Sequence, residues 1–484
     1  MENSYQKFAK DVLIIGATTI LTALCGIILL PLLTKTLGAH DYGIWKQVEV
    51  TVSLMLGFVG LGLPSAMTRF LPAKTNREET REEFYSAFCV VFIVTLVVSI
   101  ILIVSANFIA GAFFENATQI VRVTGLIILV WSLNLAFLSL FRAFRQMKRY
   151  SIFVIADAYG QVGVIAYLVL SGHGLLSIIL GVLAIRVLIL IILFFQVRSQ
   201  FGIGRPRFHR IKEYLNFGLP TIPGMIASWV VTSSDRYVIA YFLGAASVGI
   251  YSAGYSIGSV ILMFSGVLSF VLPPTLSKLY DEGRMEEVKT HLSYSLKYFL
   301  AVGIPFVFGA AILSKPVLVL LSTSEIANEG YLITPLIALT TLILVAFQLS
   351  GTQILLLVKK TRILGVTWII GAAINLILNM LVVPRIGILG AAITTLITCT
   401  LVGAVIAYYS FRQFRFNIDW LFIIKSLIAS VIMSLAVWKI SPEGTLTTVL
   451  TVMAGIVIYL AVLILLRVFR KEEFEFFKKL FRLT

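Results

Sequence analysis

Residues 219–243 read LPTIPGMIASWVVTSSDRYVIAYFL, an apolar run whose middle changes abruptly to Ser233, Ser234, Asp235 and Arg236. A charged group deep in hydrocarbon is costly, so it normally faces a partner or a water-filled cavity. We therefore interpret Asp235 and Arg236 as part of a functional site. The alternative is that the two charges only fix the packing of helices.

The same stretch identifies an internal repeat. It ends in LGAASVGIY at 243–251, and LGAHDYGIW stands at 37–45, so Leu-Gly and Gly-Ile-aromatic recur at an offset of 206 residues. A weaker match pairs 168–174 with 381–387 at an offset of 213, where coincidence remains an alternative. The repeat predicts two copies of one unit, an internal symmetry common in transporters, whose substrate site lies where the copies meet.

Composition determines the class of protein. Of the 484 residues, 59% are hydrophobic and 13% are charged, whereas soluble domains have about 25% charged residues. The chain is therefore predicted to be an integral membrane protein. The net charge of +16 does not indicate nucleic-acid binding, because the basic residues sit in short loops rather than on one folded face. The three cysteines lie in apolar runs and suggest no disulfide framework.

Runs of about 20 apolar residues predict transmembrane helices. The first copy contains the runs 12–34, 44–63, 84–108, 120–141, 150–171 and 175–197. The second copy contains 215–243, 249–271, 293–314, 332–357, 364–383 and 388–410, and two more runs follow at 420–438 and 446–467. The sequence thus predicts an all-α membrane protein with fourteen transmembrane helices, in two pseudo-symmetric six-helix lobes around a central cavity, plus two extra C-terminal helices.

The loops support this count independently. With both termini inside, the cytoplasmic segments and the run ends next to them hold 30 of the 39 basic residues, as the positive-inside rule requires. We predict a multi-pass protein of the plasma (inner) membrane with cytoplasmic termini. Its expected parts are an N-terminal lobe at 1–206, a C-terminal lobe at 207–415, and helices 13 and 14 with a cytoplasmic amphipathic tail at 416–484. Phe474, Phe477 and Phe481 share one face of that tail, a pattern typical of a helix at a membrane interface.

Several motifs carry a resemblance to a known family. The segments 235–239 (DRYVI), 249–253 (GIYSA) and 217–220 (FGLP), together with 35–38 (KTLG) and 69–72 (RFLP), are similar to those of the polysaccharide-biosynthesis flippases. That family belongs to the superfamily of multidrug, oligosaccharidyl-lipid and polysaccharide exporters. The resemblance covers essentially the whole chain. It implies a carrier that moves a polyprenyl-diphosphate-linked oligosaccharide from the inner to the outer leaflet by alternating access.

Such a cargo needs a cation inside the membrane. Arg186 lies near the centre of the sixth run, too deep to reach an interface easily, and its planar guanidinium can donate two hydrogen bonds to phosphate. Asp157, on the preceding helix at a similar depth, is the other expected member of this substrate site. The alternative is a purely structural ion pair between Arg186 and Asp157.

Asp235 and Arg236 are the remaining expected substrate-binding residues. Neighbours on a helix do not face each other, so we expect each to have its own partner. Glu49 lies at a similar depth on the second helix, and a bridge from Glu49 to Arg236 would form a gate that closes the outer side. Lys46, three residues before Glu49, competes for the same carboxylate.

The sequence predicts no enzyme, no cofactor and no metal site. It contains no phosphate-binding G-x-x-x-x-G-K-[ST] loop and no H-E-x-x-H motif. A multidrug or cation antiporter of the same superfamily and a peptidoglycan lipid-precursor flippase remain alternative functions. The expected partners are the lipid-linked oligosaccharide and membrane lipid. A polysaccharide polymerase and glycosyltransferases are further candidate partners, and nucleic acid is not expected.

Overall fold

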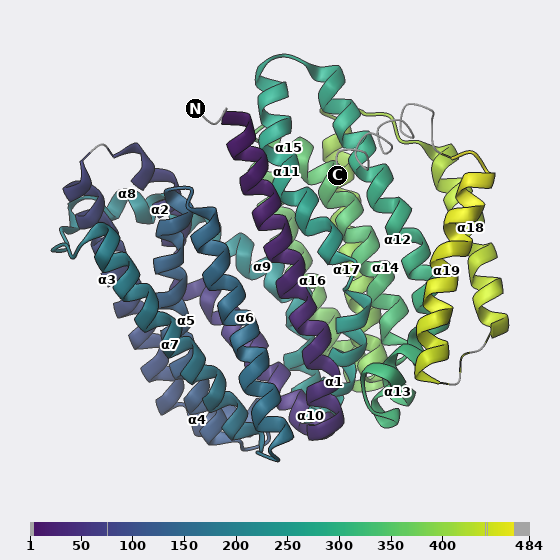
Figure 1. Cartoon of the computed structure of the whole chain (residues 1–484), viewed down its shortest axis with the longest axis horizontal. Helices are drawn as coiled ribbons and strands as arrows, with labels where there is room; N and C mark the ends of the chain where they lie inside the picture. The colour runs from purple at the N-terminus through teal and green to yellow at the C-terminus, as the bar shows by residue number, and fades with distance from the viewer. Residues whose placement is uncertain (1–3, 75, 441, 443, 469–484) are drawn as a thin grey trace. The chain divides into compact units, whose positions relative to one another are not determined.

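The chain is described by a computed structural model over residues 4–74, 76–440, 442 and 444–468. This described part forms helices and contains no strand (Figure 1). Twelve helical segments in it are long and apolar enough to cross a membrane. The protein is therefore an all-α membrane protein, as its composition predicts. The predicted amphipathic helix of the tail lies outside the described residues.

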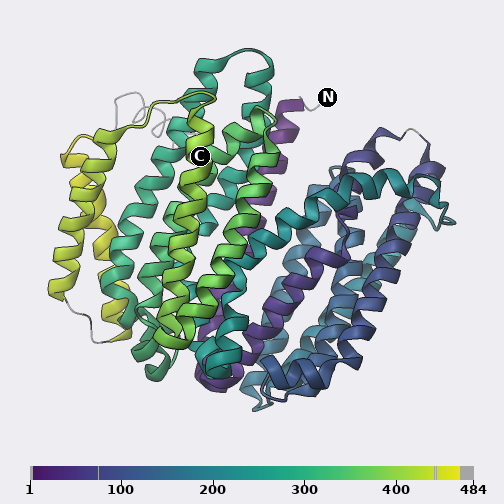
Figure 2. The ribbon, with the colours of Figure 1, turned by 180° about the vertical axis from the view of Figure 1, so that it is seen from behind.

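Two of the twelve segments are far longer than the roughly 20 residues that one crossing requires. Leu13–Val59 has 47 residues and Phe208–Gly258 has 51. The helical geometry is interrupted at Gly38, with φ of 75°, and at Gly244, with φ of 83°. Figure 2 shows the purple N-terminal part of the chain as two rods that point in different directions. The first long segment thus covers most of the runs 12–34 and 44–63. The second covers the run 215–243 and the start of the run 249–271, which continues into the next helix, Leu262–Asp281. The total of fourteen crossings stays a prediction.

The chain divides into two compact units, and the first contains Met1–Ser252 and Arg362–Thr398. The lobe boundaries predicted at 206 and 415 follow the sequence repeat rather than these contacts, and they stay a prediction. The helices of the first unit are α1 (Ser4–Val59), α2 (Leu63–Phe70), η1 (Leu71–Ala73), α3 (Arg77–Val104), α4 (Ala106–Phe113), α5 (Thr118–Ala143), α6 (Met147–Leu170), α7 (Leu175–Phe201), η2 (Phe208–Arg210), α8 (Ile211–Gly218), η3 (Leu219–Thr221), α9 (Ile222–Ser233), most of α10 (Asp235–Gly258), α16 (Thr361–Ile386) and the first part of α17 (Ile388–Phe411).

Helix α5 is the central element of this first unit. It packs against α3 on one face and α7 on another (Figure 1). The core between them is built from large apolar side chains, including Phe84 of α3, Phe137 and Phe141 of α5, and Leu193 of α7. Because these side chains repeat at helical spacing, each helix buries one apolar stripe and leaves the opposite face for lipid.

The second unit contains Ala253–Thr361 and Cys399–Thr484. Its longest helix, α12, packs against α14, α18 and α19. The Tyr459 hydroxyl of α19 donates a hydrogen bond of 2.9 Å to the carbonyl oxygen of Ala301 in α12. The helices that lie wholly in this unit are α11 (Leu262–Asp281), α12 (Met285–Leu321), α13 (Ser324–Gly330), α14 (Ile333–Phe347), η4 (Gln348–Thr352), α15 (Gln353–Leu357), α18 (Trp420–Ile440) and α19 (Thr445–Leu465).

The seventh apolar run is helical but irregular. A 3-10 turn, η3, joins α8 to α9, and a turn at Ser234 precedes α10. Pro220 lies in η3 and Pro223 lies in the first turn of α9. Proline lacks the N–H that a helix interior requires, so it is tolerated in a first turn and interrupts a longer helix. The break at Ser234 has a direct effect on the two charged residues that follow it.

The repeat noted in the sequence has a structural counterpart around Gly43 and Gly249. A Cβ atom on Gly43 would overlap the carbonyl oxygen of Ala245, and one on Gly249 would overlap the carbonyl oxygen of Ala39. These two contacts are related by the same offset of 206 residues. Two equivalent helices therefore cross at their glycines with a reciprocal geometry, which is what an internal two-fold relationship predicts.

The weaker echo keeps its register in the helices that follow it. Helix α7 begins at Leu175 and α17 begins at Ile388, which is the offset of 213. The glycines with positive φ, Gly172 and Gly387, are 215 residues apart. The turn before the helix is therefore two residues longer in the first copy.

Candidate substrate-binding site

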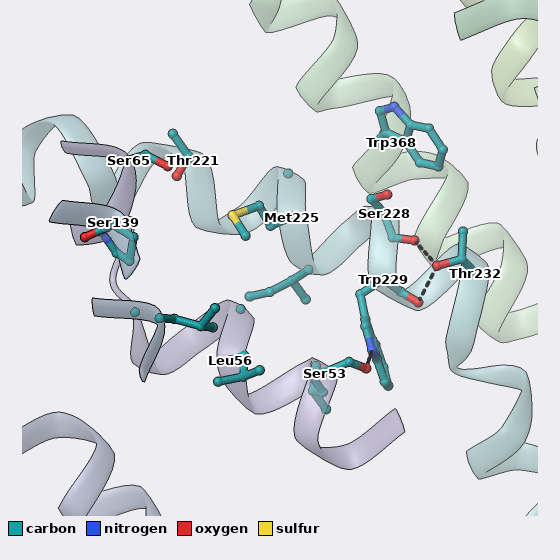
Figure 3. A pocket seen from close by; sticks show the side chains of 18 of the residues that line it. Ser53, Leu56, Ser65, Ser139, Thr221, Met225, Ser228, Trp229, Thr232 and Trp368 are labelled. Atoms are coloured by element: carbon teal, nitrogen blue, oxygen red, sulfur yellow. Dashed lines mark hydrogen bonds between the residues drawn. The ribbon is translucent and has the colours of Figure 1, made fainter. Parts of the chain in front are cut away.

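A cavity in the first unit has a volume of about 820 Å³, and none of the predicted site residues lies in its wall. Its wall combines small and apolar residues with hydroxyl and aromatic groups (Figure 3). Its polar and aromatic members include Ser53 of α1, Ser139 and Arg142 of α5, Tyr150 of α6, Ser228, Trp229 and Thr232 of α9, and Trp368 of α16. Cavities of this size and mixed lining commonly hold ligands.

Trp229 is held in place by a second helix. Its indole N–H donates a hydrogen bond of 3.0 Å to the Ser53 hydroxyl, as Figure 3 shows. Two residues before Ser53, the hydroxyl of Thr51 lies 2.6 Å from the hydroxyl of Tyr237. The Tyr237 ring also packs edge-on against Trp229, with centroids 5.9 Å apart. These contacts fix the register of α9 and α10 against α1, so the indole occupies one position in the cavity wall.

Arg142 carries the only charge among the described residues that line the cavity. It lies in the last turn of α5, and its guanidinium carbon is 5.8 Å from the centroid of the Tyr150 ring. A guanidinium beside an aromatic ring is stabilised without losing its hydrogen-bond donors. The wall can therefore offer several N–H donors to an anionic group.

Arg186 is buried next to this wall rather than in it. Only 6% of the residue is exposed, and its guanidinium carbon lies 3.7 Å from the centroid of the Trp131 ring. The Asn134 side chain donates a hydrogen bond of 3.1 Å to the Arg186 carbonyl oxygen. Both partners are on α5, and Leu135 of that helix lines the cavity. Arg186 thus packs against the helix whose Leu135 lines the cavity.

Asp157 and Arg186 are joined through a third residue. The Gln161 amide donates a hydrogen bond of 2.8 Å to Asp157 and accepts one of 3.4 Å from Arg186. Asp157 Oδ1 and Arg186 Nε have no hydrogen-bond partner among the described residues. The structure therefore brings the two predicted residues together, as a relay through an amide rather than as the direct ion pair that was the structural alternative.

The prediction that Asp235 and Arg236 have separate partners was wrong. Arg236 Nη1 lies 2.8 Å from Asp235 Oδ1, and it also donates a hydrogen bond of 2.8 Å to the Thr232 carbonyl oxygen. The rule that neighbours do not face each other holds inside a continuous helix. Here Ser234 interrupts the helix, so Arg236 can bend back to the preceding turn. Tyr251 of the same unit donates a 2.5 Å hydrogen bond to Asp235 Oδ2.

Glu49 and Arg236 do not form the predicted bridge in this structure. The Lys46 ammonium lies 2.7 Å from Glu49 Oε2, one helical turn away on the same face. That pairing is the competing arrangement that the spacing allowed. With Glu49 held by Lys46 and Arg236 held by Asp235, both charges have local partners.

The sequence did not single out Arg142, Trp229 or Trp368. Arg142 was counted among the cytoplasmic loop cations, and the two tryptophans were read as ordinary members of apolar runs. Arg142 directly follows the run 120–141 and Trp368 lies near the start of the run 364–383, whereas Trp229 lies in the middle of the run 215–243. The spacing of residues along single helices does not reveal that three different helices bring them to one wall.

A family profile described as polysaccharide biosynthesis protein matches residues 8–280, and a second, described as MatE, matches residues 220–381. Two relatives come from Haloferax volcanii. The "Probable flippase AglR" is 28% identical over 39% of this chain and 39% of its own length. The "Probable low-salt glycan biosynthesis flippase Agl15" is 20% identical over 57% of this chain and 58% of its own length. These matches thus span less than two thirds of either relative.

Solved structures share the fold. A structure of the lipid II flippase MurJ in an inward closed conformation superposes with a TM-score of 0.78, at 17% identity, over 93% of this chain and 98% of that one. An inward-facing multidrug resistance transporter of the MATE family gives a TM-score of 0.66, at 14% identity, over 82% of this chain and 94% of that one. Because the first profile covers more than half of the residues, this chain belongs to the polysaccharide biosynthesis protein family.

Proposed function

We propose that this protein is a flippase that moves a polyprenyl-diphosphate-linked oligosaccharide from the inner to the outer leaflet by alternating access. The observation that carries the proposal is the cavity wall in which Arg142 stands among aromatic and hydroxyl side chains. A phosphate-linked glycolipid combines an anionic linkage, a hydrated sugar and an apolar tail. The wall offers a chemically suitable surface to each of these parts.

Each part of the cargo has a matching group. The planar guanidinium of Arg142 can donate paired hydrogen bonds to phosphate oxygens. The rings of Tyr150, Trp229 and Trp368 present flat apolar surfaces together with polar tips, which suits the mixed faces of a sugar. Hydroxyl groups such as Ser139 and Ser228 can exchange hydrogen bonds with sugar hydroxyls.

The names of related proteins support the same class of cargo. Agl15 is named as a flippase of glycan biosynthesis and MurJ as a flippase of lipid II. The likeness to MurJ keeps a peptidoglycan lipid precursor as an alternative cargo with the same phosphate chemistry. The proposal also places the protein in the plasma membrane with both termini cytoplasmic. There it would work alongside a polysaccharide polymerase and glycosyltransferases.

A multidrug antiporter is the second candidate, because the MatE profile matches part of the chain. Its cargo in the cation-exporting form would be a lipophilic cation. Arg142 would repel such a molecule, since it is the charged group in the described part of the wall. The cavity therefore favours an anionic cargo.

We propose further that the buried charged residues take part after Arg142, when the carrier changes its conformation. Thr232 lines the cavity while its carbonyl oxygen holds Arg236, and α5 contributes both to the wall and to the surroundings of Arg186. Under this proposal, a rearrangement of these helices exposes the guanidinium groups to the phosphate. Under this proposal the substrate-binding residues are Arg186, Arg236, Asp157 and Asp235, and the gating residues are Glu49, Lys46 and Arg236.

The test is a flipping assay in proteoliposomes with a fluorescent polyprenyl-diphosphate disaccharide and a membrane-impermeant quencher. Losing a charged hydrogen-bond partner costs about 1.5–3 kcal/mol, so we expect Arg142→Gln to slow flipping roughly 10- to 150-fold. Arg142→Lys should retain part of the rate, because lysine keeps the charge but not the paired donors.

Arg145→Gln is the matched control. Arg145 lies just beyond α5, three residues from Arg142, and its guanidinium is 3.5 Å from Asp11 at an exposed position outside the cavity wall. This variant should flip at the wild-type rate. Equal rates for Arg142→Gln and Arg145→Gln, in protein that elutes as a single folded species, would refute the assignment of Arg142 to the cargo.

A further inference from the structure

Glu115 lies in a strained turn between α4 and α5. Its φ is 47° and that of the following Asn116 is 67°. Asparagine tolerates this left-handed region, whereas for glutamate it is uncommon and costs energy. Hydrogen bonds from Asn116 N to Ala110 O, at 2.9 Å, and from Ala117 N to Phe114 O, at 2.9 Å, hold the turn. Hydrogen bonds thus hold the Glu115 backbone in a conformation that is unfavourable for glutamate. Such strain points to a role for the Glu115 side chain.

The Glu115 carboxylate joins three segments of the first unit. Oε1 accepts a hydrogen bond of 2.6 Å from the Ala245 backbone N–H, at the start of the helix that follows the Gly244 turn. Oε2 lies 2.7 Å from His40 Nε2, and His40 Nδ1 lies 2.9 Å from Asp41 Oδ1. Glu115 therefore caps a helix N-terminus in the second copy of the repeat and binds the turn in the first copy.

The contact between Glu115 and the Ala245 N–H favours glycine at position 244. A Cβ atom at Gly244 would lie 2.8 Å from Glu115 Oε1, and its φ of 83° is itself unfavourable for other residues. At Gly38, the repeat equivalent of Gly244, no described atom lies within 4 Å of the corresponding Cβ position. The carboxylate cap is thus specific to one of two otherwise matching turns.

We propose that Glu115 and His40 form a pH-dependent latch that keeps the outer side of this carrier closed. The latch rests on the proposed alternating access, because the outer side can only open if the Gly244 turn separates from the turns that hold Glu115 and His40. It lies next to the crossing of Gly43 and Gly249, where the repeated helices approach most closely.

The pH dependence of the latch follows from the ability of the two His40 ring nitrogens to donate hydrogen bonds. Both ring nitrogens of His40 face carboxylate oxygens, so both contacts are hydrogen bonds only when the ring is protonated. The other groups facing Glu115 and His40 are Asp41 from the first turn and the Ala245 N–H from the second. When pH rises and the imidazolium loses a proton, one ring nitrogen becomes an acceptor facing a carboxylate, and the latch weakens.

At low pH the latch weakens for a different reason, which is protonation of the Glu115 carboxylate. The hydrogen bond from the Ala245 N–H and the contact with His40 hold the pKa of Glu115 below its ordinary value. A depressed folded-state pKa means that the contribution of this carboxylate is present above its unfolded-state pKa and is lost as pH falls through the folded-state value. The latch is therefore strongest in the window between protonation of Glu115 and deprotonation of His40.

The experiment measures outer accessibility without any cargo. A reporter Ser233→Cys is placed in a background in which Cys25, Cys89 and Cys399 are replaced by alanine, and its labelling from outside by a membrane-impermeant maleimide is divided by that of Ser171→Cys. Loss of a helix cap corresponds to about a 2- to 30-fold change in an equilibrium, so Glu115→Gln should raise the ratio by that factor at pH 6.5. Glu329→Gln, an exposed carboxylate on α13, is the matched control and should leave it unchanged.

A second variant tests the switch. In the parent protein the ratio should rise between pH 6 and pH 8.5, whereas His40→Gln, which keeps a neutral donor for Glu115, should show no such step. Equal labelling of the Glu115→Gln and Glu329→Gln variants would overturn the latch, and a pH step that persists in His40→Gln would overturn the switch. If Glu115→Gln does not fold, the His40→Gln comparison decides. Failure of the proposed cargo would leave these labelling results unaffected.

Discussion

At the scale of single residues, Arg186 is the group whose role is decided by its surroundings. It stacks on Trp131 and reaches Asp157 only through Gln161. A guanidinium used purely for structure would be expected to pair directly, because an incompletely paired buried charge is costly. The relay instead leaves Arg186 Nε buried without a hydrogen-bond partner among the described residues. Under the proposed function, the anion of the cargo would be that partner.

This arrangement predicts different outcomes for stability and transport. Arg186→Ala should lower the thermal stability of the purified protein by about 1–3 kcal/mol and abolish flipping. The double variant Arg186→Ala with Asp157→Ala should regain most of the stability, because neither charge is left buried alone. Flipping should stay lost. Recovery of transport in the double variant would show instead that Arg186 is only a structural partner of Asp157.

The charged residues also show where prediction from sequence ends. The depth of Glu49, Arg186 and Arg236 along their helices followed from counting residues. Their partners did not, because a partner depends on how a side chain bends. A rule for continuous helices separated Asp235 from Arg236, and the break at Ser234 reunited them.

At the scale of helices, the crossing of Gly43 and Gly249 determines how closely the two copies of the repeat approach. Two helices approach this closely only where both present glycine, since any side chain would force the backbones apart. In the sequence, these two glycines are recognisable as the first residues of the two matching Gly-Ile-aromatic motifs. The reason for the match, a backbone contact in each direction, became visible only when the two turns were placed together.

We predict that Gly249→Ala is destabilising although alanine favours helices. Overpacking costs typically 1–3 kcal/mol and more where the obstacle is backbone, which outweighs the gain of about 1 kcal/mol from helix propensity. The measurement is the melting temperature in detergent, followed by size-exclusion chromatography. Gly26→Ala, where no described atom lies within 4 Å of the added Cβ, is the control and should melt at or above the parent temperature. A melting temperature for Gly249→Ala that matches the control would contradict the close crossing.

The apolar runs predicted most helices well, because hydrophobic length alone specifies a membrane crossing. The eleventh and twelfth runs, for example, correspond to α16 and α17. The seventh run lies within one long helical segment, Phe208–Gly258. Its 3-10 turn at Leu219–Thr221 and the turn at Ser234 do not follow from a count of apolar letters.

At the scale of the whole molecule, composition and loop charge established an all-α membrane protein, and the motifs led to the family before any geometry was known. The cavity could not be predicted in the same way. Its wall collects Ser53, Arg142, Trp229 and Trp368 from four helices, so its chemistry depends on packing between segments more than 300 residues apart. The predicted cations were deep and conspicuous in the sequence, whereas Arg142 looked like a loop residue.

The central claim is that the cargo is a phosphate-linked glycolipid rather than a lipophilic cation. The most direct measurement compares both in the same proteoliposomes, by quenching of a fluorescent polyprenyl-diphosphate disaccharide and by efflux of a fluorescent lipophilic cation. The account predicts protein-dependent flipping of the glycolipid that Arg142→Gln slows, with cation efflux at the rate of empty vesicles. Cation efflux that depends on the protein, without movement of the glycolipid, would contradict it.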